Sequence, residues 1–169
     1  MSAKSLYTIK PLIKSLDEKG GLETVFKMIR GELYIGGLCD TMKIDFKDVS
    51  AGWMFIESTY DSGLHGNAFK IAHGAWQATM IDTAAGFAAL SLVPKGHGAL
   101  TKAIKDIEYK KPVISGLFKA VGHAVWDKSK PGHISAHAQI LDENDVCYAE
   151  GNIVVRVKRL EELIAKNDL

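Results

Sequence analysis

The stretch from Ala75 to Val93 constrains the fold more than any other part of the sequence. It consists mainly of apolar residues, and Asp82 is its only formal charge. A helix that is apolar nearly all round must be surrounded by other elements. An ionised carboxylate in such a helix has to be hydrogen-bonded, paired or open to water, because otherwise it would be neutralised. The sequence therefore predicts a wrapped helix in which Asp82 has a role in chemistry, or else faces solvent or caps a loop.

The same stretch is long enough to suggest a membrane span. Gln77, Asp82 and several Gly and Thr oppose that interpretation, since a mid-span Asp alone costs ~2.5–3.5 kcal/mol on the insertion scale. The formal net charge is +1, from 21 basic and 20 acidic residues, with no basic block. We therefore expect no membrane and no nucleic acid as partner, but a small molecule or another protein.

Cysteine and histidine spacing gives no indication of a metal site. Cys39 and Cys147 form no CxxC or Cys/His pattern, which excludes a disulfide framework and a zinc site. His133 and His137 fall in a strand-like run, where they would lie ~13 Å apart. The N-terminus has no secretory signal pattern. We expect a cytoplasmic protein with no metal and no cofactor.

The rest of the chain alternates between helical and strand-like patterns. An N-terminal arm, residues 1–30, shows helical spacing in two pieces interrupted at Gly20-Gly21. Pro94 and Gly96 are expected to end the apolar helix. The tail, residues 161–169, can form a short surface helix. Strands are predicted at 42–49 and 53–59, which form a hairpin, and at 99–110, 117–127, 133–141 and 146–158.

The last of these strands indicates what the sheet packs against. One of its faces carries small residues in a row, which indicates that something bulky lies close to it. The apolar helix is the only candidate. The order ββ-α-ββββ then predicts an α+β hotdog fold over residues 31–160, a curved antiparallel sheet wrapped around one long helix. The face in question comprises Cys147, Ala149, Gly151, Ile153 and Val155.

His73-Gly74 stands where a loop becomes the helix. The first amides of a helix have no intrahelical acceptor and lie at the positive end of its dipole. Such amides can polarise a carbonyl and stabilise the oxyanion that forms when it is attacked. A plain helix entry is the alternative for His-Gly, and a turn residue is the alternative for Asn67.

The text from Asn67 onward, N-A-F-K-I-A-H-G-A-W-Q-A-T-M-I-D-T-A, resembles the PaaI-like hotdog acyl-CoA thioesterases. Those proteins carry N-x-x-G-x-x-H-G-G followed by a helix Asp, usually as D-T-A. The resemblance extends over roughly residues 35–158 and includes I-E-Y-K-K-P, which is similar to a family strand ending in an aromatic residue and then basic-Pro. Lys70 and Ala75 replace two glycines of the pattern, so we expect a differently shaped loop.

The resemblance implies a role for each matching residue. Gly74 would donate its amide to the thioester carbonyl, and Asp82 would activate or orient the attacking water, or attack directly. Asn67 would help to place the thioester or the water, and His73 would order the loop. The family also has a hydroxyl early in the strand after the helix; Thr101 is one residue out of step, so its use requires a shift or a bulge.

Four further residues are candidates for substrate binding. Trp76 and Gln77 are large for a helix start and either narrow the acyl pocket or pack at a subunit contact. Lys111 and Arg156 lie at predicted strand ends, where they either meet the phosphates of coenzyme A or remain solvated. We expect hydrolysis of an acyl-CoA or related thioester to free acid and thiol. The alternatives are a non-catalytic acyl-CoA-binding module and a hotdog dehydratase or hydratase, although no H-F-P or D-x-N-P-x-H motif is present.

The spacing of Gly74 and Asp82 predicts an oligomer. Eight helical residues span ~12 Å, too far for both groups to serve one carbonyl. The geometry closes if a second copy lies antiparallel about a two-fold axis, so that Gly74 of one chain faces Asp82 of the other. We expect a homodimer with shared active sites and leave open a dimer of dimers, a homotetramer.

Overall fold

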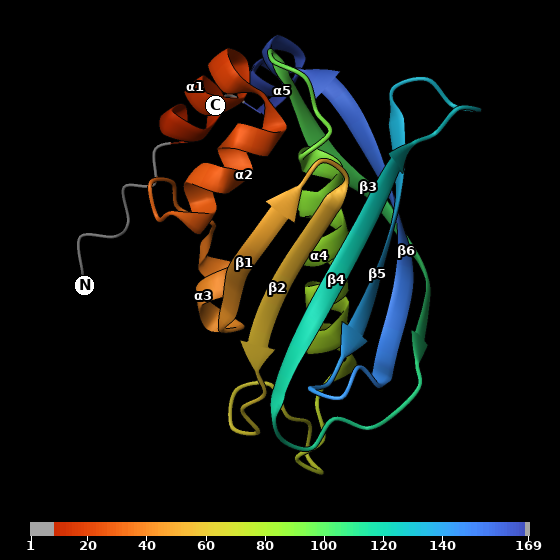
Figure 1. Cartoon of the computed structure of the whole chain (residues 1–169). Coiled ribbons are helices and arrows are strands. Elements are labelled where there is room, and N and C mark those ends of the chain that lie inside the picture. The colour runs from red at the N-terminus through yellow and green to blue at the C-terminus, as the bar shows by residue number, and fades with distance from the viewer. Residues whose placement is uncertain (1–8, 168–169) are drawn as a thin grey trace.

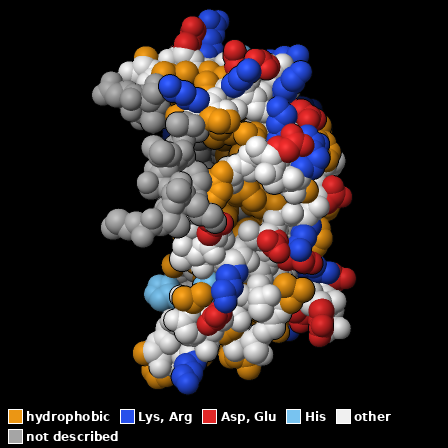
Figure 2. Space-filling view, turned by 90° about the vertical axis from the view of Figure 1, so that its left-hand side faces the viewer, with side chains coloured by type: hydrophobic (Ala, Val, Ile, Leu, Met, Phe, Trp, Pro, Cys, Tyr) orange, Lys and Arg blue, Asp and Glu red, His pale blue; other side chains and the backbone are white. Residues whose placement is uncertain are grey.

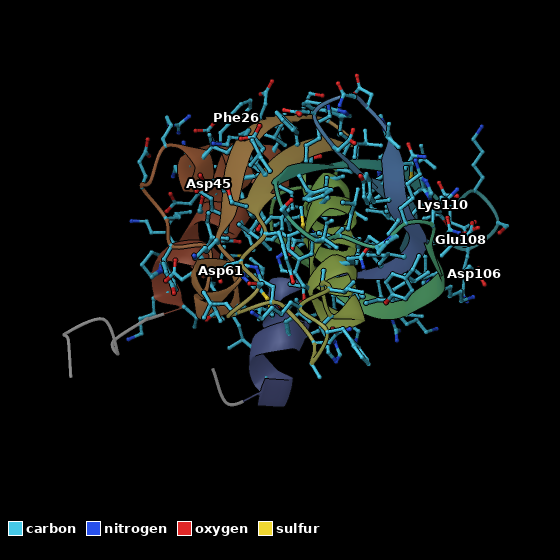
Figure 3. All side chains as sticks on the ribbon, turned by 90° about the horizontal axis from the view of Figure 1, so that it is seen from below. Phe26, Asp45, Asp61, Asp106, Glu108 and Lys110 are labelled. Atoms are coloured by element: carbon cyan, nitrogen blue, oxygen red, sulfur yellow. The ribbon has the colours of Figure 1, made fainter. Side chains whose placement is uncertain are left out.

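The computed structural model describes residues 9–167. Within that range six antiparallel strands form one curved sheet around a long helix, α4 (Gly74–Leu90), as Figure 1 shows from the side and Figure 3 from below. The predicted α+β hotdog fold is confirmed. The other elements are α1 (Lys10–Lys19), α2 (Gly21–Ile29), α3 (Gly37–Thr41), β1 (Ile44–Ser50), β2 (Trp53–Thr59), β3 (His97–Tyr109), β4 (Leu117–Trp126), β5 (His133–Leu141), β6 (Cys147–Arg159) and α5 (Leu160–Asn167).

The strand order makes β1 and β3 the two edges of the sheet. The strands lie in the order β1-β2-β4-β5-β6-β3, so β3 follows α4 in the chain but pairs with β6 at the far side. Helix α2 packs against β1, the first edge (Figure 1). Along the other edge, β3, no further strand is paired within the described residues.

Small residues allow α4 to lie close to the sheet. Ala84 and Ala85 of the helix are fully buried, and a Cβ placed on Gly122 of β4 would collide with the Ala84 carbonyl. Larger apolar side chains fill the space around this contact, among them Met80 and Ile81 of the helix. The close approach removes apolar surface from water, which is the main favourable contribution to folding.

The small-residue face of β6 is buried as predicted, with one correction. A Cβ on Gly151 would lie 3.2 Å from Ile81 Cγ2 of α4 and 3.1 Å from Ile107 Cγ1 of β3. The helix is therefore not the only bulky neighbour of this face, because an irregular part of β3 also leans over it. Cys147, at the start of the strand, is only half-buried.

The helices differ from the expected ones in two places. α4 ends at Leu90 rather than near Val93, because Ser91 stops it: the Ser91 hydroxyl lies 2.7 Å from the Ala88 carbonyl and 2.8 Å from the Gly52 amide. The short helix α3 was not predicted. No helix among residues 9–167 is both long enough and apolar enough to cross a membrane.

Candidate functional site

Helix α4 has a single face that the sheet leaves uncovered, and Asp82 lies on it. The buried residues of α4 face the sheet, whereas the half-buried and exposed ones recur at a spacing of three and four, which places them in one stripe along the helix. In the sequence this carboxylate stands within an apolar helix. In the fold it lies on the side of the helix that the sheet leaves uncovered. The stripe consists of Ala75, Ala78, Thr79, Asp82, Thr83, Gly86, Phe87 and Leu90.

Asp82 is held by Thr101 of the neighbouring strand β3. The Thr101 hydroxyl donates to Asp82 Oδ1 at 2.9 Å. The β3–β6 ladder shifts register between Thr101 and Ala103, an irregularity of the kind that the sequence spacing required. The two side chains line a cavity of about 180 Å³ whose other walls are mostly apolar, including Phe87 and Val155. We call it the mid-helix cavity.

The start of α4 presents an amide without an acceptor. His73 is the N-cap, and its Nδ1 accepts the Ala75 N–H at 3.1 Å. The Gly74 N–H donates to no acceptor within residues 9–167. The Tyr109 hydroxyl donates to the Gly74 carbonyl at 3.2 Å, and a Cβ on Gly74 would lie only 3.0 Å from that hydroxyl. A glycine here gives Tyr109 room to lie beside the free amide.

A second cavity, of about 420 Å³, opens at this helix start and is called the helix-start cavity below. Gly74, Gln77, Tyr109, Lys110 and Lys111 are among its walls. Gln77 is only 4% exposed, and its Oε1 accepts no hydrogen bond within the described chain. A buried amide oxygen without a donor is costly. A ligand N–H or a water in this cavity would satisfy it.

The two lysines of the helix-start cavity differ in their partners. Lys110 Nζ lies 2.8 Å from Glu150 and 3.6 Å from Glu108, and Figure 3 shows Glu108 and Lys110 together at the end of β3. The bond to Glu150 raises the pKa of Lys110, and that of Glu150 is lowered by Lys110. Lys111 makes no ion pair within residues 9–167, and its Nζ lies 5.8 Å from the centroid of the Tyr148 ring. Lys111 is thus the cation available to an anionic ligand.

Asn67 and Trp76 lie outside both cavities. The Asn67 side-chain oxygen accepts the Phe69 and Ile71 amides at 2.9 and 3.2 Å, so it is used to shape the loop before α4. Trp76 is 1% exposed and stacks on His65, with ring centroids 5.6 Å apart. The bulk of Trp76 fills the core under the loop, and the prediction that it narrows an acyl pocket stays a prediction.

Arg156 also lies apart from Gly74 and Asp82. It borders a third cavity, of about 380 Å³, together with Trp126 and His133. Its neighbour Val155 is buried and lines the mid-helix cavity. Successive strand residues point to opposite faces, so Arg156 lies on the outer side of the sheet.

Tyr109 is a residue of the candidate site that the sequence pattern did not mark as one. Its hydroxyl contacts Gly74, and its ring forms part of the helix-start cavity. The signal was present in I-E-Y-K-K-P, whose tyrosine directly precedes the two lysines. That motif indicated the strand end, but not that the strand end returns to the start of α4.

Comparisons with known proteins agree with this geometry. Residues 69–138 match the family model of the thioesterase superfamily. Among curated proteins none matches the sequence. The structure is similar to the thioesterase HI1161 from Haemophilus influenzae, with a TM-score of 0.69 at 14% identity, over 85% of this chain and 94% of that one.

Two further solved structures are similar over most of their length. The PaaI protein from the E. coli phenylacetic acid degradation operon gives a TM-score of 0.69 at 16% identity, over 83% of this chain and 96% of that one. The protein smu.793 from Streptococcus mutans, solved bound to acetyl-CoA, gives 0.60 at 18% identity, over 69% and 89%. The resemblance to PaaI-like hotdog thioesterases is confirmed by the match of residues 69–138 to the superfamily model and by the shared fold.

Proposed function

We propose that this protein hydrolyses an acyl-CoA or related acyl thioester to a free acid and a thiol, with Asp82 and the Gly74 amide as its catalytic groups. The observation that carries the proposal is the Asp82–Thr101 pair on the open stripe of an otherwise apolar helix. A carboxylate held by a hydroxyl at the opening of a cavity is positioned to act on a bound electrophile.

The chemistry assigned to Asp82 follows from the hydrogen bond that one of its two carboxylate oxygens accepts. Thr101 donates to Oδ1, which leaves Oδ2 for a water molecule or for the substrate itself. As a base, Asp82 takes a proton from water while the water oxygen bonds to the thioester carbon. As a nucleophile it forms an anhydride that water then opens. In both routes the carbon–sulfur bond breaks and the thiolate leaves with the electron pair.

The free Gly74 amide supplies the complementary function. Attack on the thioester places negative charge on the carbonyl oxygen, and an N–H at the positive end of the helix dipole stabilises it. Asn67 and His73 order the loop and the helix entry that hold this amide in place. Tyr109 fixes the adjacent carbonyl.

One chain does not bring these two groups to the same carbonyl. Gly74 and Asp82 are separated by eight helical residues, ~12 Å along the axis. We propose that a second copy lies antiparallel, so that each of two sites takes Gly74 from one chain and Asp82 from the other. The stripe of α4 that carries Asp82 is the face that such a copy would cover.

The edge strand β3 is the proposed line of contact. Leu100, Ile104 and Tyr109 on this strand are 49%, 41% and 51% exposed. An unpaired edge with exposed apolar side chains invites pairing with another strand. Pairing of two β3 strands would extend the sheet and bring the two α4 stripes face to face. A dimer of dimers would require a further surface.

The helix-start cavity is proposed to hold the pantetheine and phosphate parts of coenzyme A. Gln77 Oε1 can accept an amide N–H of pantetheine, and Lys111 can meet a phosphate. We place the reaction in the cytoplasm, where Cys39 and Cys147 would remain thiols, as they are in the structure.

The test is a panel of short, long and aryl acyl-CoAs, with a thiol reagent reporting the released CoA. Release with at least one of them is the expected result. Binding without release from any member would contradict the proposal and favour an acyl-CoA-binding module. Burial raises the pKa of the Cys39 thiol to about 11, so this cysteine adds little background to the assay.

A further inference from the structure

An apolar groove continues the mid-helix cavity toward the C-terminal end of α4. The groove encloses about 240 Å³ between α1, α4, β3 and α5. Phe87, Leu90 and Ala99 line both spaces, so they form a common wall. The cavity that contains Asp82 therefore adjoins an apolar groove that α1 and α5 border on the other side.

The walls of this groove come from one face of each flanking helix. α1 contributes Leu12 and Leu16 at a spacing of four, and α5 contributes Leu160 and Ile164 at the same spacing. Gly98 of β3 allows α5 to lie close to the strand, because a Cβ on Gly98 would lie only 2.7 Å from Leu163 Cδ1. Leu16 and Leu160 are buried, so the groove is the space left between two helices that partly pack against the core.

The groove contains no hydrogen-bonding side chain among the described residues that line it. Its rim is exposed at Ile9 (36%), whereas Leu100, also at the rim, lies on the strand proposed to meet a second copy. Figure 2 shows the side of the molecule that carries α1 and α2, with hydrophobic side chains exposed in its upper half between charged ones. A ligand held here can gain from burial of hydrocarbon but not from polar contacts.

We infer that this groove binds the hydrocarbon tail of the acyl group, so that the substrate is an unsubstituted aliphatic acyl thioester of medium to long chain length. This inference rests on the proposed function, because it places the thioester carbon beside Asp82. The stripe of α4 runs from Asp82 to Leu90, eight residues or ~12 Å, directly into the groove. Continuity with the Asp82 cavity selects an acyl tail over other apolar occupants.

The first experiment compares acetyl-, hexanoyl- and decanoyl-CoA with the full-length protein. Burial of each methylene allows kcat/KM to rise by up to about fourfold. We expect a rise from acetyl to decanoyl. Ala99→Phe narrows the groove where it meets the mid-helix cavity and should lower kcat/KM for decanoyl-CoA by roughly tenfold more than for acetyl-CoA. Leu12→Trp narrows the far end and should affect decanoyl-CoA alone.

A matched control and a binding measurement complete the test. Lys14→Trp adds the same indole to the exposed side of α1 and should leave the chain-length profile unchanged. Calorimetry with the unreactive thioethers ethyl-CoA and decyl-CoA reports on the groove independently of hydrolysis. Tighter binding of decyl-CoA than of ethyl-CoA, lost in Ala99→Phe, would support the groove whether or not a thioester is cleaved. Failure to cleave any thioester would refute the proposed function and leave the binding result intact.

Three outcomes overturn the inference. One is equal turnover and equal binding of short and long chains by the unmodified protein. Another is an equal loss on both chain lengths in Ala99→Phe with folding unchanged by circular dichroism. The third is dissociation of the oligomer in Ala99→Phe, measured by sedimentation, since the groove would then be occupied by a second copy of the chain.

Discussion

The start and the middle of α4 present different groups to the two cavities beside them. At the start, the free Gly74 amide, the unpartnered Gln77 oxygen and Lys111 lie around the helix-start cavity. In the middle, Asp82 and Thr101 open into a mostly apolar cavity. The first region can hold a carbonyl but has no base, and the second has a base but no free amide. We infer from this difference that a complete site uses both regions, and the ~12 Å between them is the basis for the proposal that two chains contribute.

Removing the base should have the largest effect. Asp82→Asn keeps the shape of the side chain but cannot accept a proton or attack, so we expect kcat to fall by about 10²–10⁴-fold. Circular dichroism should show an unchanged fold. Asp45→Asn is the matched control, because Asp45 is 77% exposed on β1, away from α4. Near-full activity in Asp82→Asn would remove the mid-helix region from the mechanism.

Removing the amide tests the helix start. Gly74→Pro deletes the N–H at the first position of α4, where proline is well tolerated, and the extended backbone of His73 (ψ 138) suits a residue before proline. Gly74→Ala is the control, since it adds the same Cβ beside Tyr109 but keeps the N–H. We expect kcat of the proline variant to lie about 10²–10³-fold below that of the alanine variant. Equal rates would assign the whole effect to displacement of Tyr109.

Loosening the base should cost less than removing it. Thr101→Val removes the hydrogen bond to Asp82 Oδ1 while keeping the size of the side chain, and kcat should fall by about tenfold. Thr101→Ser retains the hydroxyl and should stay close to the unmodified protein. If valine and serine behave alike, Thr101 does not position the carboxylate.

The smallest effects are expected from replacing the cations Lys111 and Arg156. Comparing their effects on KM tests which side of the sheet meets the phosphates. Lys111→Ala should raise KM for acyl-CoA by about two- to fivefold, as expected for an exposed charge contact, without changing KM for an S-acyl-N-acetylcysteamine that lacks the phosphates. Arg156→Ala should change KM less, because Arg156 borders a cavity apart from both halves of the site. A larger effect of Arg156 would move the phosphates to the outer face.

Hydrophobic periodicity made most of the fold predictable. The apolar helix, with Asp82 as its only charge, required a wrapping sheet, and the small residues at Ala149 and Gly151 indicated close packing. Asp82 and Gly74 could be singled out because a carboxylate in an apolar helix and an amide at a helix start each have a specific physical consequence.

The rest depended on contacts that local sequence does not encode. Trp76 and Gln77 are adjacent, yet one fills the core and the other lines a cavity, since their directions are set by the aromatic cluster with His65. Thr101 reaches Asp82 across an irregular ladder, and Tyr109 reaches Gly74 from 35 residues away. Such long-range pairs are fixed by the fold as a whole.

The central claim, that each site uses both halves from different chains, is tested by mixing two inactive variants. Asp82→Asn and Gly74→Pro are combined under conditions where subunit exchange is demonstrated by mass spectrometry. In each mixed dimer one site would contain an intact Asp82 and an intact Gly74, and the other site would contain both substitutions. The mixed dimer should therefore recover about half of the normal turnover. No recovery in dimers that demonstrably exchange would contradict the claim and require Asp82 to act with donors of its own chain.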